Sequence, residues 1–360
     1  MAAIACRPSP PALLKSLPRP LIAPPSVASQ PPASPAQSSP TPSPMDEQPL
    51  AFDYASDFSE GLAVVRRGEQ YQFIDRQGTP VLTVGEEFVG VSAFAGDRAL
   101  VKTETLYGYL SRTGAVVVMP QYPSATPFSE GLAAVRTGTK YGYIDPAGGL
   151  VIEPQFDLAT PFASGLAATR DGDRYGYITA SGQWEVMPQY EDVGSFSEGF
   201  AAVRLDQQWG YIDAAGETVI PIQFDGAFAF SESLARVRLG QRWGYVDPAG
   251  EMAIAPTYGF ASDFSEGLAA VLVDSRWGYV NPAGEMAIAP QFDYAAPFSE
   301  GRAAVLVDGA YGYIDASGKT VVAPQFSNAG SFSEGLTWVE ENGVRHYVDV
   351  QGQPMGLISR

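Results

Sequence analysis

A repeat of 34 residues runs through most of the chain and constrains its fold more than any other feature. A phenylalanine, followed in most copies by Ser-Glu-Gly, recurs once after 36 residues and then seven times after 34. It stands at Phe58, Phe94, Phe128, Phe162, Phe196, Phe230, Phe264, Phe298 and Phe332. An aromatic-Gly pair keeps the same spacing, from Tyr107-Gly108 to Tyr311-Gly312. Nine units therefore occupy residues 51–360, and tandem units of this length build repeat architectures.

Each unit has the pattern of three short strands. In the unit that begins at Phe292, residues 303–307 are apolar, residues 311–314 read Tyr-Gly-Tyr-Ile, and residues 320–323 read Thr-Val-Val-Ala. The Asp-Gly pair between the first two runs is a hairpin signal. The segment Asp-Ala-Ser-Gly before the third run has the composition of a tight turn. These patterns predict an all-β protein of antiparallel units. One unit is too short to bury its own apolar surface, so it must pack on its neighbours.

We expect the nine three-stranded units to form an elongated β-solenoid or open superhelix. The alternative is a closed propeller-like ring, but nine blades exceed the usual range of roughly four to eight, and three strands per blade are few. The first and last units should cap the stack, because both depart from the aromatic-Gly-Tyr pattern. They read Tyr71-Gln72-Phe73 and Arg345-His346-Tyr347 at that place.

Residues 1–50 have a different composition from the repeats. They contain 14 of the 30 prolines, many Ser and Ala residues, and three basic side chains. Such a segment has too little apolar surface to offset the entropy of ordering, so we expect a disordered leader or tether. The repeat domain that follows holds all of the net negative charge.

The composition of the leader is compatible with three cellular locations. Ala3-Ile4-Ala5-Cys6 resembles the end of a bacterial lipoprotein signal, in which Cys6 would be lipidated and the leader would tether the repeats to a membrane. We favour this cell-envelope interpretation, although only five residues precede Cys6. A cytoplasmic protein that starts at Met45 and an organellar transit peptide are the alternatives. No apolar run is long enough for a transmembrane helix.

The charge and the rare residues restrict the ligands. A net charge of −18 disfavours nucleic acids and anionic membrane surfaces, and it favours a basic protein partner whose binding weakens with salt. A single Cys allows no intrachain disulfide. One Cys and one His are too few for a Cys/His zinc site, and we expect neither metal nor cofactor.

The repeated carboxylates are the first candidates for catalytic residues. A Glu follows the Phe-Ser pair at Glu60, Glu130, Glu198, Glu232, Glu266, Glu300 and Glu334, and a Gly comes next in all of these copies except that of Glu232. Paired carboxylates serve glycosidases, but those two groups need unlike environments, whereas these share one setting. We expect them to cap turns. Turn residues such as Asp145 and Asp247 could bind calcium, but their pattern favours turn capping. His346 is expected to pack at an edge rather than act as a base, and we predict no catalytic residue and no enzyme.

The chain resembles the WG repeat family at three pairs, Trp209-Gly210, Trp243-Gly244 and Trp277-Gly278. The flanking pattern also agrees, from Phe-Ser-Glu-Gly-Leu-Ala-Ala-Val-Arg at 128–136 to Val-Ile-Glu-Pro-Gln-Phe at 151–156. The resemblance covers residues 51–360. It implies a mainly bacterial β-repeat module that serves as an interaction scaffold, and it brings no catalytic residues.

Trp209, Trp243 and Trp277 are the candidate binding residues. Regularly spaced Trp and Tyr rings can stack on sugars, or they can belong to the core, and the exposure of these three side chains distinguishes the two. We predict a non-enzymatic acidic scaffold for protein–protein interaction. The alternative is a cell-envelope module that binds polysaccharide through Trp and Tyr, and a hydrolase with a Glu/Asp pair in one odd unit is a third hypothesis.

Overall fold

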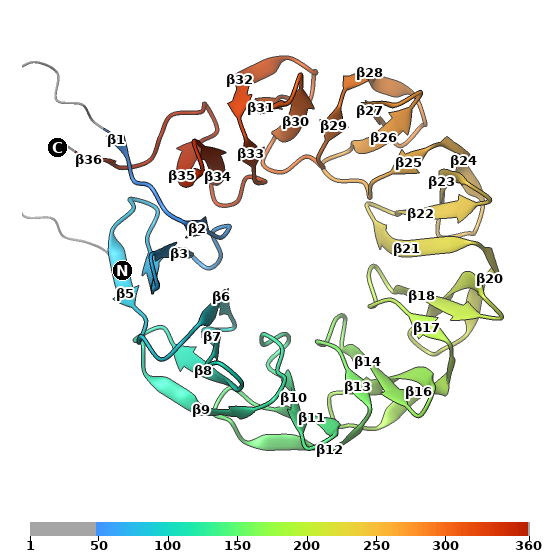
Figure 1. The fold of residues 1–360 in the computed structure, drawn as a ribbon. Coiled ribbons are helices and arrows are strands. Elements are labelled where there is room, and N and C mark those ends of the chain that lie inside the picture. Colours follow the sequence, from blue (N-terminus) through green and yellow to red (C-terminus); the bar gives the residue numbers. More distant parts are fainter. Residues whose placement is uncertain (1–47, 359–360) are drawn as a thin grey trace, which may run out of the picture. The chain divides into compact units, whose positions relative to one another are not determined.

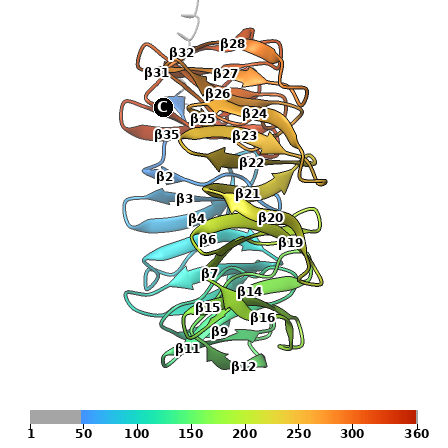
Figure 2. The same cartoon turned by 90° about the vertical axis from the view of Figure 1, so that its right-hand side faces the viewer.

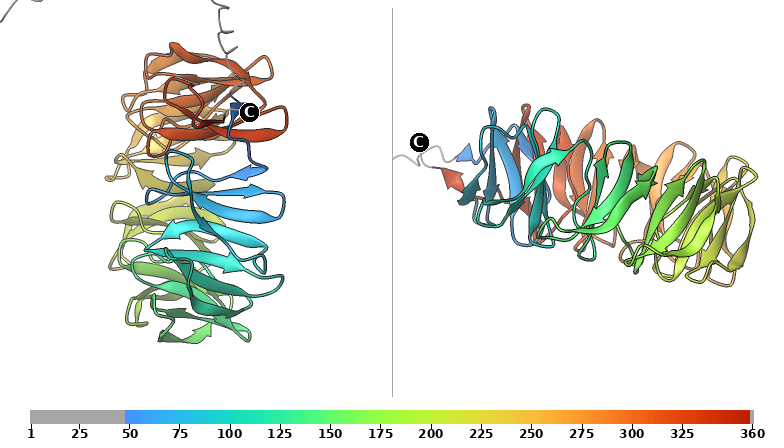
Figure 3. Two further views of the ribbon diagram at one scale, coloured as in Figure 1. Left: turned by 90° about the vertical axis from the view of Figure 1, so that its left-hand side faces the viewer. Right: turned by 90° about the horizontal axis from the view of Figure 1, so that it is seen from below.

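The computed structural model describes residues 48–358, and these residues form a closed ring of nine blades, built from strands alone (Figure 1). The expected open solenoid is therefore wrong, and the propeller given as its alternative is the observed fold. Cys6 and most of the expected leader lie outside the described residues. Only its last three residues, Gln48 to Leu50, are described, and the first two of these form β1 (Gln48–Pro49). The views from the side show the blades standing next to one another around the ring (Figures 2 and 3).

A complete blade has four antiparallel strands rather than the three expected. In the seventh blade, the order from the axis outward is β25, β26, β27 and β28 (Figure 1). The added inner strand, β25 (Phe260–Ala261), pairs with only two residues of its neighbour. It lies just before Phe264, in a segment for which the sequence patterns predicted no strand. A strand of two residues has no alternation to detect, which is why the pattern missed it.

The strand bounds repeat closely around the ring. The first three blades contain β2 (Tyr54–Ala55), β3 (Ala63–Arg67), β4 (Gln70–Ile74), β5 (Pro80–Thr83); β6 (Gly90–Ala95), β7 (Arg98–Lys102), β8 (Tyr107–Ser111), β9 (Val116–Tyr122); β10 (Ala133–Thr137), β11 (Lys140–Ile144) and β12 (Leu150–Phe156). The next three contain β13 (Leu158–Ala159), β14 (Leu166–Asp171), β15 (Arg174–Thr179), β16 (Trp184–Tyr190); β17 (Asp192–Val193), β18 (Phe200–Leu205), β19 (Gln208–Asp213), β20 (Thr218–Phe224); β21 (Gly226–Ser231), β22 (Leu234–Leu239), β23 (Arg242–Val246) and β24 (Met252–Tyr258). The last three contain β25, β26 (Ala269–Val273), β27 (Arg276–Val280), β28 (Met286–Phe292); β29 (Tyr294–Ala295), β30 (Ala303–Val307), β31 (Ala310–Ile314), β32 (Thr320–Phe326); β33 (Asn328–Ala329), β34 (Leu336–Glu341) and β35 (Val344–Asp349).

The glycine of the aromatic-Gly pair is required by a bulge in the outer strand. Between Trp209 and Tyr211 the pairing with β20 shifts register. A Cβ on Gly210 would lie 2.7 Å from the carbonyl oxygen of Ile220, which is closer than real Cβ contacts come. The two exceptions, Gln72 and His346, lie in blades whose outer strand is built differently. In the first blade, Gln72 pairs directly with Thr83 and its strand pair shifts register only farther along.

The core is divided among the contacts between successive blades. Eight tyrosines of the third strands are fully buried there, namely Tyr109, Tyr143, Tyr177, Tyr211, Tyr245, Tyr279, Tyr313 and Tyr347. Each hydroxyl donates to a backbone carbonyl of the next blade's inner segment, at 2.6–2.9 Å. Burial raises the pKa of all eight tyrosines well above the ordinary value. The first blade has the fully buried Phe73 at this position.

Ser-Glu-Gly forms a two-residue turn that also joins neighbouring blades. The Glu has φ of 51–55° in all seven copies, and the next residue also has positive φ, as a tight hairpin turn requires. The Ser hydroxyl donates to the carbonyl of the next blade's Phe, for example from Ser265 to Phe298 at 2.7 Å. The Glu carboxylate accepts a backbone N–H from the next blade's turn, for example Gly301 N–H to Glu266 at 2.8 Å. The predicted capping is confirmed, but it acts on the turn of the following blade.

The ring closes because the ninth blade takes its outer strand from both ends of the described chain. Pro354 pairs with Val348, the N–H of Met355 donates to the Tyr347 carbonyl at 2.8 Å, and Phe52 pairs with Arg345. Next to this seam, β1 (Gln48–Pro49) pairs with β36 (Leu357–Ile358). The terminal units thus pair with each other and do not cap a stack.

The interblade links continue across the seam. Ser333 donates to the carbonyl of Phe58, and Glu334 accepts the N–H of Gly61. The same Ser and Glu contacts join successive blades elsewhere in the ring, so the ninth blade meets the first as any blade meets the next.

Candidate functional site

The antiparallel blades give the ring two unlike faces. We call the face that carries the Ser-Glu-Gly turns and the Asp-x-x-Gly turns the turn face. We call the opposite face, which carries the hairpins between the second and third strands, the hairpin face. In the seventh blade the turn at Ser265 and the turn at Asn281 belong to the turn face, and the hairpin at Asp274-Ser275 belongs to the hairpin face.

The carboxylates of the turn face are engaged by backbone. Besides the seven Glu residues, the Asp that opens each Asp-x-x-Gly turn accepts N–H groups of its own turn. Asp247, for example, accepts from Ala249 and Glu251, both at 3.0 Å. Among the described residues, no three His, Cys, Asp or Glu side chains are placed to share a metal ion. The face is a regular, acidic surface whose oxygens stabilise turns.

The predicted binding residues all lie on the hairpin face, and each is half-buried. Trp277 packs between Phe260 of its own blade, with ring centroids 5.7 Å apart, and Tyr294 of the next blade, at 5.6 Å. Trp243 packs in the same way between Phe228 and Phe260, both at 5.6 Å. These two tryptophans therefore combine core packing with a surface edge.

The rings continue into a row that we call the aromatic ladder, formed by Phe228, Trp243, Phe260, Trp277, Tyr294 and Tyr311. It runs over the sixth, seventh and eighth blades. Phe228, Phe260 and Tyr294 are 41 %, 42 % and 41 % exposed. The repeated aromatic-Gly pair predicted Trp243, Trp277 and Tyr311 as members of an aromatic row. It did not predict Phe228, Phe260 and Tyr294, which lie outside that pair and are the most exposed members.

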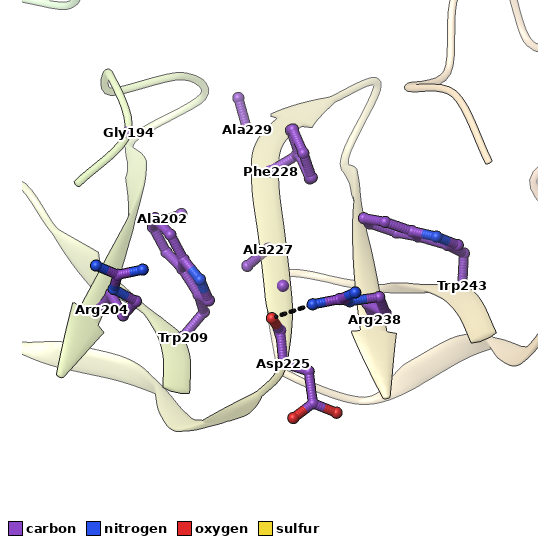
Figure 4. A pocket seen from close by; sticks show the side chains of 11 residues that line it. Gly194, Ala202, Arg204, Trp209, Asp225, Ala227, Phe228, Ala229, Arg238 and Trp243 are labelled. Atoms are coloured by element: carbon purple, nitrogen blue, oxygen red, sulfur yellow. Dashed lines mark hydrogen bonds between the residues drawn. The ribbon is translucent and has the colours of Figure 1, made fainter. Parts of the chain in front are cut away.

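Trp209 differs from the other two tryptophans. Among the described residues it makes no ring–ring contact, and it borders a groove of about 580 Å³ between the fifth and sixth blades (Figure 4). Trp243 and Phe228 form the other side of this groove, and Ala202 and Gly226 are among the small residues that line it. Gly226 stands where the next two blades have Phe260 and Tyr294, whose rings pack on Trp243 and Trp277.

Basic side chains follow the hairpin face in the first six blades. The residue paired with the aromatic of the third strand is basic there, at Arg66, Lys102, Arg136, Arg170, Arg204 and Arg238. Five of the six lie over their aromatic partners at 5.3–5.9 Å. In the seventh and eighth blades the same position is Leu272 and Leu306. The residue at this position of the hairpin face therefore changes from basic to apolar around the ring.

The ninth blade departs most from the repeat. Trp338 occupies a position that is Ala in five blades, and the Arg345 guanidinium lies 4.2 Å from its ring centroid. Burial raises the pKa of Asp57, although a hydrogen bond from Trp338 partly opposes this shift. His346 is buried where other blades have glycine, and burial lowers its pKa. It packs at the seam, 6.2 Å from the Phe326 ring.

The model of the WG containing repeat matches eight segments, at residues 49–71, 107–141, 141–175, 175–209, 209–243, 243–277, 277–309 and 311–344. The chain belongs to the WG containing repeat family. The predicted resemblance is thus confirmed. No curated protein matches the chain.

Solved structures resemble this WG repeat protein in fold alone. A eukaryotic initiation factor has 10 % sequence identity, a TM-score of 0.60, and coverage of 85 % of this chain and 92 % of that one. The WD40 domain of SCAP from fission yeast has 9 % identity, a TM-score of 0.42, and coverage of 86 % and 97 %. Hsv2p from Kluyveromyces lactis has 9 % identity, a TM-score of 0.40, and coverage of 64 % and 92 %. Within residues 48–358, no helix has the length and apolarity needed to cross a membrane.

Proposed function

We propose that this protein is a non-enzymatic scaffold that binds partner proteins through the hairpin face of its ring. The observation that carries the proposal is the aromatic ladder, in which three neighbouring blades each expose about two fifths of a large aromatic side chain. Exposed aromatic side chains in a continuous row are typical of interaction surfaces, where such rings contribute most of the binding free energy.

The acidic turn face supports a second contact, with basic segments of a partner. Its carboxylates are held by backbone N–H groups, yet their charges face solvent and together attract positive charge. Binding through this face should weaken steeply with salt, whereas binding through the ladder should not. Salt dependence therefore separates the two contacts.

The alternative is a module that binds polysaccharide through Trp and Tyr rings. Trp209 favours it, since one side of this ring borders an open groove. Trp243 and Trp277 favour it less, because aromatic neighbours pack against them on both sides. A sugar that stacks on a ring needs an uncovered face.

The test is crosslinking and affinity capture with the full-length protein in its native cell. The variant Phe260→Ser/Tyr294→Ser removes two exposed rings of the ladder. The matched control, Met119→Ser/Met187→Ser, removes two exposed apolar side chains from outer strands. We expect a stoichiometric protein that the wild type and the control retain and the ladder variant loses. Retention by all three, or recovery of polysaccharide without protein, would contradict the proposal.

A further inference from the structure

We propose that the groove between the fifth and sixth blades binds an aromatic side chain that a partner protein presents next to acidic residues. The inference rests on the proposed scaffold function and names the partner chemistry that one part of the hairpin face recognises. It is carried by the repeat, because at the next two junctions between blades an aromatic ring of the protein occupies the equivalent place.

The equivalent grooves at the next two junctions between blades show what kind of group fits beside the tryptophan. Between the sixth and seventh blades, Phe260 packs on Trp243 of the preceding blade at 5.6 Å. Between the seventh and eighth, Tyr294 packs on Trp277 at 5.6 Å. The equivalent pair between the fifth and sixth blades is Trp209 and Gly226, which has no ring to offer. These two junctions show that the space beside the tryptophan of the preceding blade accepts an aromatic ring, and the space beside Trp209 is the equivalent one.

The lining matches such a ring in size and polarity. The groove holds about 580 Å³, enough for an aromatic side chain and its neighbours in a peptide (Figure 4). Its lining includes Ala202, Ala227 and Ala229 beside the rings of Trp209 and Trp243. A ring inserted here loses its exposure to water and gains contacts on both sides, as binding hot spots do.

The charges at the groove define what should flank the ring. Arg204, Arg238 and Asp225 are its charged lining residues, whereas the filled groove between the seventh and eighth blades has Leu272 and Leu306 in place of the two arginines. The Nε atoms of both arginines have no hydrogen-bond partner, and the same holds for Arg66, Arg136 and Arg170 in other blades. A carboxylate is the acceptor that guanidinium groups bind most strongly.

The acidic neighbours leave these arginines only partly engaged. Arg204 lies 3.6 Å from a Glu191 oxygen and 3.9 Å from an Asp192 oxygen. Arg238 donates to the backbone carbonyl of Asp225 at 2.9 Å, while the Asp225 carboxylate accepts the N–H of Gly240 at 2.6 Å. A carboxylate from a partner can therefore pair with Arg238 without displacing a side-chain ion pair.

The repeat also supplies the variant that blocks the groove. Gly226 has no positive φ, and a Cβ there would meet its nearest atoms, in Arg238, at 3.4 Å. The variant Gly226→Phe gives this position the side chain of the seventh blade. Asn328→Phe makes the same insertion at the equivalent position of the ninth blade and is the matched control.

The probe is a fluorescein-labelled peptide with the sequence Asp-Glu-Phe-Glu-Asp, titrated against the full-length protein by fluorescence polarisation. We expect binding that is at least tenfold weaker for Gly226→Phe, about 1.4 kcal/mol, and unchanged within about twofold for Asn328→Phe. Arg238→Gln should weaken binding about fivefold and reduce its salt dependence. Peptides with Ala in place of Phe, or Lys in place of the acidic residues, should not bind.

Several outcomes would overturn the groove assignment. One is that Gly226→Phe binds the probe peptide as tightly as the wild type does. Another is that the wild type binds the Ala peptide as tightly as the probe, and a third is that the wild type does not bind the probe. Binding of a polysaccharide that Gly226→Phe abolishes would assign the groove to sugars and equally overturn it. Unchanged thermal unfolding of Gly226→Phe shows that a loss of binding is local. If Gly226→Phe still captures the partner that the ladder variant loses, the scaffold function stands and the groove assignment fails.

Discussion

The buried tyrosines predict that the ring unfolds abruptly in alkali. Eight hydroxyls are buried between blades, and burial raises the pKa of each above the unfolded value of about 10. The folded state therefore holds eight protons that the unfolded chain releases. The stabilisation is complete below pH 10 and is lost as the pH rises above it.

The size of the effect follows from the number of groups. One proton released on unfolding changes the free energy of unfolding by about 1.4 kcal/mol per pH unit, so eight change it by about 11 kcal/mol. The whole stability of a typical domain is about 5–15 kcal/mol. We therefore expect the ring to unfold within about one to two pH units above pH 10, with steep dependence on pH.

Tyrosinate absorbance and circular dichroism, recorded together, measure this transition. The chain has 18 tyrosines, and the eight that are fully buried should ionise only as the strand signal disappears. Gradual ionisation of all 18 with the strand signal intact would refute the reasoning. Tyr279→Phe, patterned on Phe73 of the first blade, should lower the steepness by one proton and cost about 1 kcal/mol at neutral pH.

Three further predictions concern single positions. Gly210→Ala should lower the free energy of unfolding in urea by about 2 kcal/mol or more, because its Cβ would lie 2.7 Å from a carbonyl oxygen, whereas Gln72→Gly should change it by less than about 1 kcal/mol. Glu300→Ala removes the acceptor of the Gly335 N–H at 2.7 Å and should cost about 1 kcal/mol in the same assay, and Glu300→Gln should cost less. Burial lowers the pKa of His346, so its stabilising contribution is complete above the unfolded value of about 6.5 and is lost as the pH falls below it. Melting temperatures from pH 7 to about pH 5 should therefore fall for the wild type and fall less for His346→Gln.

The units and most strands could be predicted from the sequence, but the curvature could not. Residues 303–307, 311–314 and 320–323 correspond to β30, β31 and β32. Local patterns fix such strands, whereas the angle between successive units depends on packing between blades, which a repeat length does not encode. The inner strand β29 has only two residues, so the sequence contains no pattern that predicts it. Without this strand each unit has three strands, which are few for a propeller blade, and the sequence therefore favoured an open solenoid.

A signal for closure was nevertheless present in the sequence. After the turn at Asp349, the last unit lacks the apolar run ending in Pro-Gln-aromatic that closes most other units. At the other end, Phe52 stands at the place where that run ends, with no full strand before it. The last unit thus lacks an outer strand, and Phe52 stands before the first unit at the place of such a strand. Together these two features indicate that residues from both ends complete one outer strand. The departures at Gln72 and His346 belong to the same seam and do not mark free ends.

The candidate site could be predicted only in part, because the repeat pattern marks the regular residues and not the exceptions. Trp209, Trp243 and Trp277 occupy equivalent positions of the repeat. Their environments differ because the residue that packs on each ring varies, from Gly226 to Phe260 to Tyr294. Comparing the units position by position would have shown the missing ring beside Trp209.

The distribution of regular and irregular positions explains why the hairpin face is the better place for recognition. On the turn face, the Ser hydroxyl and the Glu carboxylate hold the next blade at 2.7 and 2.8 Å, so a change there weakens the ring itself. On the hairpin face, one position is Gly226 in the sixth blade, Phe260 in the seventh and Asn328 in the ninth. Because the links of the turn face already hold the blades together, side chains of the hairpin face can differ without loss of closure. Because ring closure does not depend on these side chains, they can differ in ways that suit the binding of a partner.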